Sequence, residues 1–339
     1  MIKKQRIITF IIGTSISILL FWLAFKGTNW SEVTKAILSA NYFVLIAAMA
    51  LLVFSVWIRA IRWKILISRV GSASTKDLYK VTLVGYMGNN ILPLRMGELL
   101  RAYGISRKQN IIFSGAFSSL VVERIVDLIT FILITTAVFS IFPMTDLTQK
   151  ISIAGFLIVI GFLAFLSILF KYNNKFETWY LKKQRQLISR NKKTIANHFV
   201  GFCRGISSLW QNPRPLQTIF LSFILWGMYF TFTLLSIHAF NFNLNILDTM
   251  KMGILVLTFV TFAMVIPSAP GAIGTYHAAA IAALQIVNIH VDNARAFSIM
   301  YHLTQYIPLT FIGLYYFFKL NLHTADLYNR GDIKREGVA

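Results

Sequence analysis

Long apolar stretches constrain this chain more than any other feature of its sequence. Hydrophobic residues make up 56% of the 339 residues and charged residues only 13%, whereas a soluble globular domain carries about 25% charged residues. A helix needs about 20 mostly apolar residues to cross a bilayer. Stretches of about that length are 7–25, 42–58, 111–141, 151–170, 216–240 and 294–318. They predict an all-α fold, a polytopic membrane helix bundle with about six full spans.

Two further apolar runs are shorter and are interrupted by residues that break helices. The first covers 78–88 and then turns back through a polar arm, and the second covers 252–266 and resumes in an alanine-rich stretch. Backbone that breaks at membrane depth must be buried in protein or line a wet cavity. We therefore expect two re-entrant helical hairpins, 78–105 and 252–287. The residues expected to break them are Asn89, Asn90, Pro93, Gly97, Pro267, Pro270, Gly271 and Gly274.

The distribution of basic residues predicts the orientation. With the N-terminus inside and both hairpins re-entering without crossing, most of the 33 lysines and arginines face the cytoplasm. Cytoplasmic loops favour Lys and Arg. The basic residues left outside are Lys26, Lys35, Lys150, Lys251 and Arg295. Two short crossing helices in place of each hairpin would leave the loop charges unchanged, so that arrangement competes with re-entry.

The two halves then have the same order of elements in opposite orientations, as in an inverted repeat with a central site. The first run, 7–25, is too long for a signal peptide and lacks a cleavage site, so it is expected to remain as a helix. The expected divisions are a first membrane half at 1–142, a helix starting the second half within 143–170, a basic amphipathic cytoplasmic linker at 171–214, the rest of the second half at 215–320 and a polar cytoplasmic tail at 321–339.

The net charge of +21 does not indicate nucleic-acid binding, because no soluble basic domain carries it. Basic loops beside an anionic leaflet explain it better. We expect the cell (plasma) membrane as the location, with both termini in the cytoplasm. The single cysteine excludes an intramolecular disulfide.

Ionisable residues at membrane depth are the candidate site. They lie on the return arm of the first hairpin and in the helix that follows: Arg95, Glu98, Arg101, Glu123, Arg124 and Asp127. Such residues are costly in a bilayer and are paired or functional. In one interpretation they form a self-satisfied ion-pair network that pins the hairpin to the helix. In the other, the arginines contact a lipid phosphate, which suits their planar, forked donors.

Other polar residues are weaker candidates. Asn89 and Asn90 are suited to satisfying the broken backbone, and His277 is either a structural hydrogen-bonding residue or a head-group contact. The sequence shows no metal-ligand spacing, nucleophile elbow or phosphate loop, so we predict no catalytic residue, metal or cofactor.

Four motifs carry a resemblance to a known family. They are Arg62-Trp63, Asn90-x-x-Pro93-x-Arg95-x-Gly97-Glu98-x-x-Arg101, Glu123-Arg124-x-x-Asp127 and Pro267-x-x-Pro270-Gly271-x-Ile273-Gly274. With them the chain resembles the membrane domain of lysylphosphatidylglycerol synthase and its stand-alone flippase-like relatives. The resemblance implies a domain that translocates lipids, since the synthase relatives move aminoacylated phosphatidylglycerol between leaflets.

Two departures from the family pattern matter. Tyr276-His277 stands where an acid is common, which affects the expected head-group charge, and no soluble transferase domain is present, so transferase activity is not expected. The expected partners are anionic or aminoacylated membrane lipids, with a separate lipid-modifying enzyme. The alternatives are a secondary transporter of a small anion, coupled to protons through Glu123 or Asp127, and a membrane scaffold that transports nothing.

Overall fold

The computed structural model describes residues 2–92, 96–141, 214–264 and 268–322, with isolated residues between 150 and 161. These ranges contain α-helices and one 3₁₀-helix and no strand. The first helices are α1 (Ile2–Phe25), α2 (Trp30–Ser39), α3 (Tyr42–Ile67), α4 (Thr75–Ile91), α5 (Gly97–Gln109) and α6 (Phe113–Ile141). The later elements are α9 (Pro215–Ala239), α10 (Ile246–Ala263), η2 (Pro270–Ala272), α11 (Thr275–Ile286) and α12 (Val291–Lys319). Most of the helix expected at 151–170, nearly all of the linker expected at 171–214 and the tail expected at 321–339 from residue 323 on lie outside the described residues.

Short polar side chains start several of these helices. The side chains of Asn29, Asn41, Ser74 and Asn245 each accept a hydrogen bond from a backbone N–H in the first turn of α2, α3, α4 and α10. The first N–H groups of a helix have no partner within the helix, and such residues supply one. The helix starts are therefore encoded locally.

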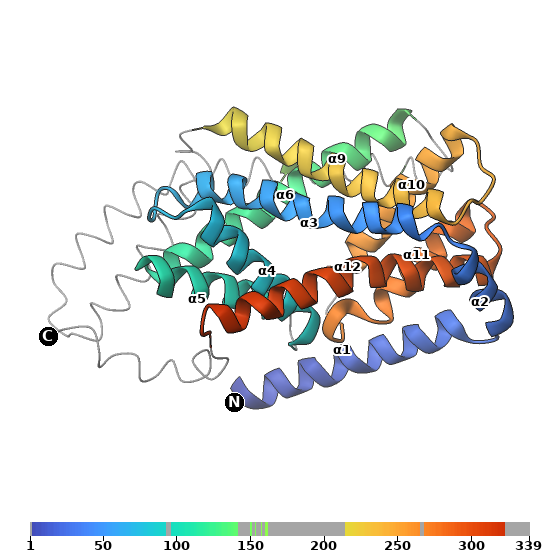
Figure 1. Ribbon diagram of the computed structural model, residues 1–339, viewed down its shortest axis with the longest axis horizontal. Helices are drawn as coiled ribbons and strands as arrows, with labels where there is room; N and C mark the ends of the chain where they lie inside the picture. Colours follow the sequence, from blue (N-terminus) through green and yellow to red (C-terminus); the bar gives the residue numbers. More distant parts are fainter. Residues whose placement is uncertain are drawn as a thin grey trace, which may run out of the picture.

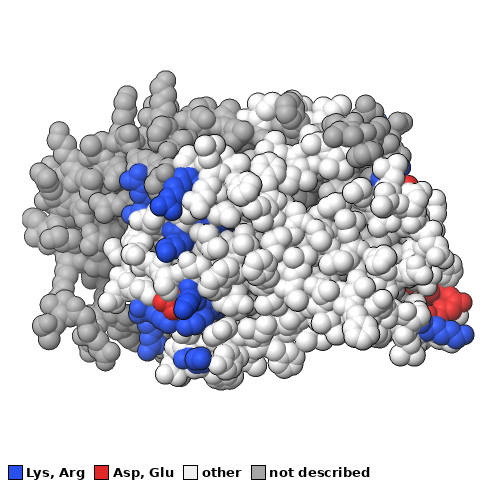
Figure 2. Space-filling model, turned by 45° about the horizontal axis from the view of Figure 1, so that its top comes forward, with Lys and Arg blue, Asp and Glu red and all other residues white. Residues whose placement is uncertain are grey.

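The helices form an elongated bundle (Figure 1). α3, α9 and α12 run along its length, and α1 lies at one edge. Among the described residues, buried apolar side chains of α3, α9, α10, α11 and α12, with others from α4, α6 and η2, form its largest core cluster. Figure 2 shows Lys and Arg side chains gathered toward one end of the visible face, next to a broad band without charged side chains.

Three described helices are long and apolar enough to cross a membrane, namely α3, α9 and α10. The length of α10 corrects an expectation. The first arm of the second hairpin was expected to begin at residue 252, but the helix begins at Ile246 and has 18 residues. At 1.5 Å per residue it is about 27 Å long, close to the roughly 30 Å thickness of the hydrocarbon core. The capped polar turn at Asn245–Lys251 adds the length that the apolar run alone did not reveal.

Two helix pairs fold back on themselves, each around a break. α4 packs along α5, and α10 packs along α11. In the first pair the backbones of Gly85 and Gly97 meet so closely that a Cβ on Gly97 would lie 1.9 Å from the Gly85 carbonyl oxygen. Only glycine fits such a contact.

The two breaks meet against α12. η2 contacts α4, and the side-chain Nδ2 of Asn90 donates a hydrogen bond to Thr310 Oγ1 on α12 over 2.7 Å. The Tyr306 ring, also on α12, would be the nearest neighbour of a Cβ placed on Gly271. The interrupted segments, about 180 residues apart in the chain, are thus brought to one place.

An ion pair joins α4 to α5 at the ends of the two helices that lie away from the break. Asp77, in the first turn of α4, lies 2.7 Å from the Lys108 ammonium and accepts a hydrogen bond from Gln109 Nε2 over 2.7 Å, both on α5. Burial raises the pKa of the Asp77 carboxyl, but hydrogen bonds to Lys108 and Ser74 and the charges of Lys108 and Lys80 outweigh it and leave the pKa below its usual value.

Candidate functional site

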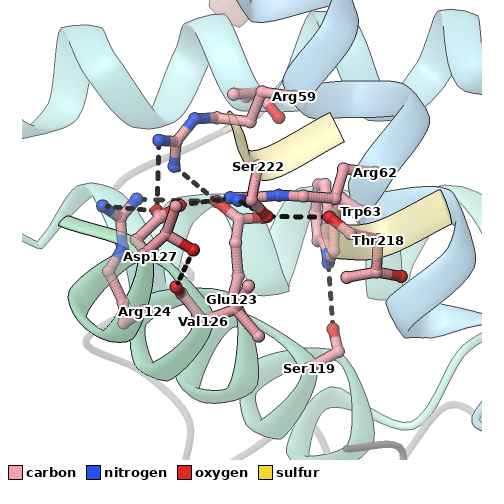
Figure 3. Close-up of polar contacts among 12 residues, drawn as sticks. Arg59, Arg62, Trp63, Ser119, Glu123, Arg124, Val126, Asp127, Thr218 and Ser222 are labelled. Carbon is pink, nitrogen blue, oxygen red and sulfur yellow. Dashed lines mark hydrogen bonds and ion pairs between the residues drawn. The ribbon is translucent and has the colours of Figure 1, made fainter. Parts of the chain in front are cut away.

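Seven charged side chains from α3, α5 and α6 meet inside the bundle, and we refer to them as the ion-pair network. Its members are Arg59, Arg62, Glu98, Arg101, Glu123, Arg124 and Asp127. Figure 3 labels the five that come from α3 and α6. Within a helix, residues three or four apart share a face. This spacing points Arg59 and Arg62 of α3 toward Glu123 and Asp127 of α6.

Glu123 lies at the centre of the network and is fully buried. One of its oxygens accepts a 2.6 Å hydrogen bond from Arg59. Both oxygens accept from the guanidinium of Arg101, over 3.2 and 3.1 Å. The Arg101 guanidinium also lies 4.4 Å from the ring centre of Trp63, so an aromatic face covers the cation on one side.

Asp127 joins the network to α9. Its oxygens lie 2.6 Å from Arg62 and 3.1 Å from Arg59. Arg62 in turn donates to Ser222 Oγ over 2.8 Å, and Arg59 donates to the Tyr229 hydroxyl over 3.0 Å. Both arginines thus bind acids on α6 and hydroxyls on α9, which holds α3, α6 and α9 together.

Glu98 and Arg124 form the open edge of the network. Their ion pair spans 2.9 Å, and Glu98 also lies 3.3 Å from Arg101. The side chain of Arg124 is 47% exposed and that of Glu98 is 25% exposed, whereas the other three arginines are buried. Arg124 is also 3.7 Å from both Glu123 and Asp127, so the half-exposed side chain joins the buried acids to the open edge.

The charges of the network do not cancel. Among the described residues it holds four arginines and three carboxylates, which leaves one excess positive charge. A net charge in a low-dielectric interior is unfavourable unless it is compensated. An anion next to Arg124 would complete the compensation.

Sequence reasoning identified five network members and missed two. Glu98, Arg101, Glu123, Arg124 and Asp127 come together as the pinning interpretation requires. Arg59 and Arg62 lie beyond residue 58, where the second apolar stretch was expected to end as a helix, and that expected end is wrong. α3 continues to Ile67, and both arginines are buried. Their three-residue spacing on a continuing helix was the available signal. Arg95, Pro93 and Pro267 lie outside the described residues.

The remaining candidates lie at or beside the backbone breaks. Asn89 Oδ1 accepts a 2.9 Å hydrogen bond from the Gly97 N–H, the first backbone donor of α5. His302 Nε2 lies 2.8 Å from the carbonyl oxygen of Gly271. His277 is buried on α11 with its ring centre 4.9 Å from that of His302. The kinks next to Pro270 place Gly271 and Gly274 at positive φ. Asn89 and His302 thus each bond a backbone group of a glycine at a break.

One group of potential metal ligands lies at the opposite end of α12, which the sequence spacing did not predict. Ligand atoms of Glu32, His290 and Asp292 lie within 4.8 Å of one another. The Asp292 carboxylate is already bound to Arg295 over 2.7 Å and accepts from the Asn29 N–H. A metal ion there would compete with the guanidinium, so the arrangement fits an ion pair better than a metal site.

Comparison with known proteins places the chain in a family. The family described as the lysylphosphatidylglycerol synthase TM region matches residues 10–313. The chain belongs to this family. The resemblance drawn from the four motifs is thereby confirmed, and the chain is a membrane protein of this family.

Curated relatives agree with this assignment. Two UPF0104 membrane proteins of Methanocaldococcus jannaschii are 24% identical over 90% of this chain and 92% of their own, and 28% identical over 68% and 92%. Glycosyltransferase AglD of Haloferax volcanii is 29% identical over 38% of this chain and 21% of its own length. No solved structure matches.

Proposed function

We propose that this protein moves a phospholipid, or a related lipid-linked head group, between the leaflets of the membrane. The observation that carries the proposal is the excess positive charge of the ion-pair network, together with the exposure of Arg124 at its edge. A head group crosses hydrocarbon at low cost only if polar partners replace its water. A lipid phosphate would supply the anion that the network lacks.

The members of the network take different parts in this proposal. Arg124 contacts the phosphate first, because it alone among the four arginines is half exposed. Its planar fork can bind two phosphate oxygens at once. Glu98, also partly exposed, pairs with Arg124, and it binds the ammonium of an aminoacylated head group once Arg124 turns to the phosphate. Arg101 holds Glu98 in place, and Glu123 holds Arg124. Arg95 remains a proposed phosphate contact from its position in the sequence.

The proposed membrane arrangement has six spans and two hairpins related as an inverted repeat. The pair α4–α5 enters from the cytoplasm and the pair α10–α11 from outside, with both termini in the cytoplasm of a plasma-membrane protein. Three observations support it: each pair folds back on itself, both breaks meet at α12, and basic side chains gather toward one end of the bundle. The divisions 1–142, 143–170, 171–214, 215–320 and 321–339 are part of this proposal.

The proposed substrates are anionic or aminoacylated lipids, which a separate enzyme would modify. Transferase activity of this chain is not part of the proposal. The relative named as a glycosyltransferase shares only 38% of this chain and 21% of its own length, too little to carry an activity over.

The test is lipid translocation in proteoliposomes. Labelled phosphatidylglycerol, phosphatidylcholine and lysyl-phosphatidylglycerol would be compared for the wild type, Arg124→Gln and Lys35→Gln. Lys35 is an exposed cation on α2, outside the network, and serves as the matched control. Loss of a charged hydrogen bond weakens binding by about 1.5–3 kcal/mol, roughly tenfold to a hundredfold. We expect Arg124→Gln to slow translocation at least tenfold and Lys35→Gln to change it less than twofold.

Two outcomes would reject the proposal. Folded protein that moves none of the three lipids, with or without a proton gradient, would refute it for these lipids. If the same protein then accumulates a small soluble anion, the secondary transporter replaces the flippase. Equal effects of the two variants would show that the network charge has no part in translocation.

A further inference from the structure

A groove with apolar walls runs between α1 and the break of the second helix pair, apart from the ion-pair network. Its volume is about 650 Å³. Its lining includes Ser17, Ile18, Trp22, Lys26, Ala269 and Ile273. Figure 1 shows α1 at the edge of the bundle. Ile18, Trp22 and Ile273 are exposed there.

α1 is fastened to the bundle at both ends of this groove. At one end Ser17 Oγ accepts a 2.7 Å hydrogen bond from the Ala269 N–H. At the other end Arg295 donates to the carbonyl oxygens of Ala24 and Lys26, over 2.8 and 2.7 Å. These hydrogen bonds hold α1 against the bundle at both ends of the groove, so the groove is a defined part of the fold.

The backbone of α1 comes closest to the break at Gly274. Gly274 has a φ of 93°, and a Cβ on it would lie 2.1 Å from the carbonyl oxygen of Ser17. No larger residue fits between the two backbones, so the groove is closed at this point.

The length of the groove matches one leaflet. Ser17 and Lys26 are nine residues apart, which corresponds to about 14 Å along a helix. Half of the roughly 30 Å hydrocarbon core is about 15 Å. A chain that enters at Lys26 would reach the membrane centre where Ser17 and Gly274 close the groove.

The open end of the groove carries a positive charge. The Lys26 ammonium lies 4.9 Å from the ring centre of Trp22, which holds it against the groove wall. Within the described ranges no carboxylate forms an ion pair with Lys26. An apolar groove with a cation at its mouth is complementary to an acyl chain with a phosphate at its head.

We propose that this groove binds one acyl chain of a phospholipid from the leaflet at the α2 end of the bundle, with the lipid phosphate at Lys26. The inference rests on the proposed function and deepens it, because it adds a binding site for the lipid beside the break of α10–α11. Binding in the groove is measurable without transport, so the two proposals succeed or fail separately.

The test is photo-crosslinking of the full-length protein in nanodiscs. The probes are phosphatidylglycerols with a diazirine either near the head or near the end of one acyl chain, and labelled peptides are mapped by mass spectrometry. We expect the near-head probe to label around Trp22 and the chain-end probe to label around Ser17.

Two isoleucine variants provide the comparison. Ile273→Trp fills the groove, and Ile219→Trp places the same bulk on an exposed isoleucine of α9. We expect labelling of residues 17–27 to fall at least fivefold in Ile273→Trp and to stay unchanged in Ile219→Trp. If Ile273→Trp does not fold, Ile18→Trp fills the groove from the α1 side. Lys26→Gln should lower the labelling about fivefold, the effect of one cation near an anionic lipid.

Several results would overturn the proposal. They are equal labelling in the groove-filling and control variants, labelling spread evenly over exposed helices, and crosslinks in the groove to a second copy of the chain. Groove labelling without translocation in proteoliposomes would retain this inference and reject the proposed transport.

Discussion

Replacing Glu123 by glutamine removes the carboxylate at the centre of the ion-pair network and keeps nearly the same shape. Arg59 and Arg101 then lose their shared charged acceptor while remaining buried. Among the described residues the network would have four cations and two acids. Breaking a buried ion pair by removing one partner costs about 3–5 kcal/mol. We expect Glu123→Gln to lower the apparent free energy of unfolding by about that amount, measured by denaturant titration in mild detergent.

A double-mutant cycle tests whether the loss comes from the pairing. Arg101→Met removes the cation that holds both oxygens of Glu123. The double variant Arg101→Met/Glu123→Gln returns the network to one excess charge. It should be about 1–3 kcal/mol more stable than the sum of the single losses predicts, as for residues in direct contact.

An exposed ion pair is the matched control. Asp248 lies 3.4 Å from Lys251 on α10, and their side chains are 45% and 32% exposed. Asp248→Asn should cost less than about 1 kcal/mol, because water screens exposed pairs. If Glu123→Gln costs no more than Asp248→Asn, or if the cycle shows no coupling, the reasoning about the network is wrong.

Three further predictions concern the supports of the fold. Gly97→Ala should destabilise the protein by at least about 2 kcal/mol by forcing a Cβ against the Gly85 backbone; Gly227→Ala in the open middle of α9 is the control and should be neutral or stabilising. Because the pKa of Asp77 is lowered, its ionised carboxylate stabilises the folded protein by about 1 kcal/mol above pH 4, and this is lost as the pH falls through the folded-state pKa. Asp77→Asn should remove this loss in melting curves from pH 6 to pH 3. An unchanged curve would contradict the prediction. Arg295→Gln should free the C-terminal end of α1, seen as faster hydrogen exchange over 17–27; unchanged exchange there would show that Arg295 does not anchor the helix.

Local physics made several elements predictable from the sequence. Helix starts follow from their capping residues, as at Asn29 and Asn41. The breaks after Ile91 and before Thr275 follow from prolines, asparagines and glycines that do not continue a helix. The end of α3 was not predictable in this way, because arginines after an apolar run are typical of a cytoplasmic loop. Only partners on other helices show that Arg59 and Arg62 stay within the bundle.

The sequence by itself determined that this is a helical membrane protein of the lysylphosphatidylglycerol synthase TM-region family, with buried charges beside an interrupted helix. Apolar length, broken runs and motif residues are properties of neighbouring positions, so they can be identified along the chain. The tertiary structure decided which charges pair. Arg59 meets Glu123 across 64 residues of chain, and Arg62 meets Ser222 across 160. No local preference encodes contacts at such separations. The excess charge at Arg124 and the groove along α1 therefore became visible only when the helices were packed together.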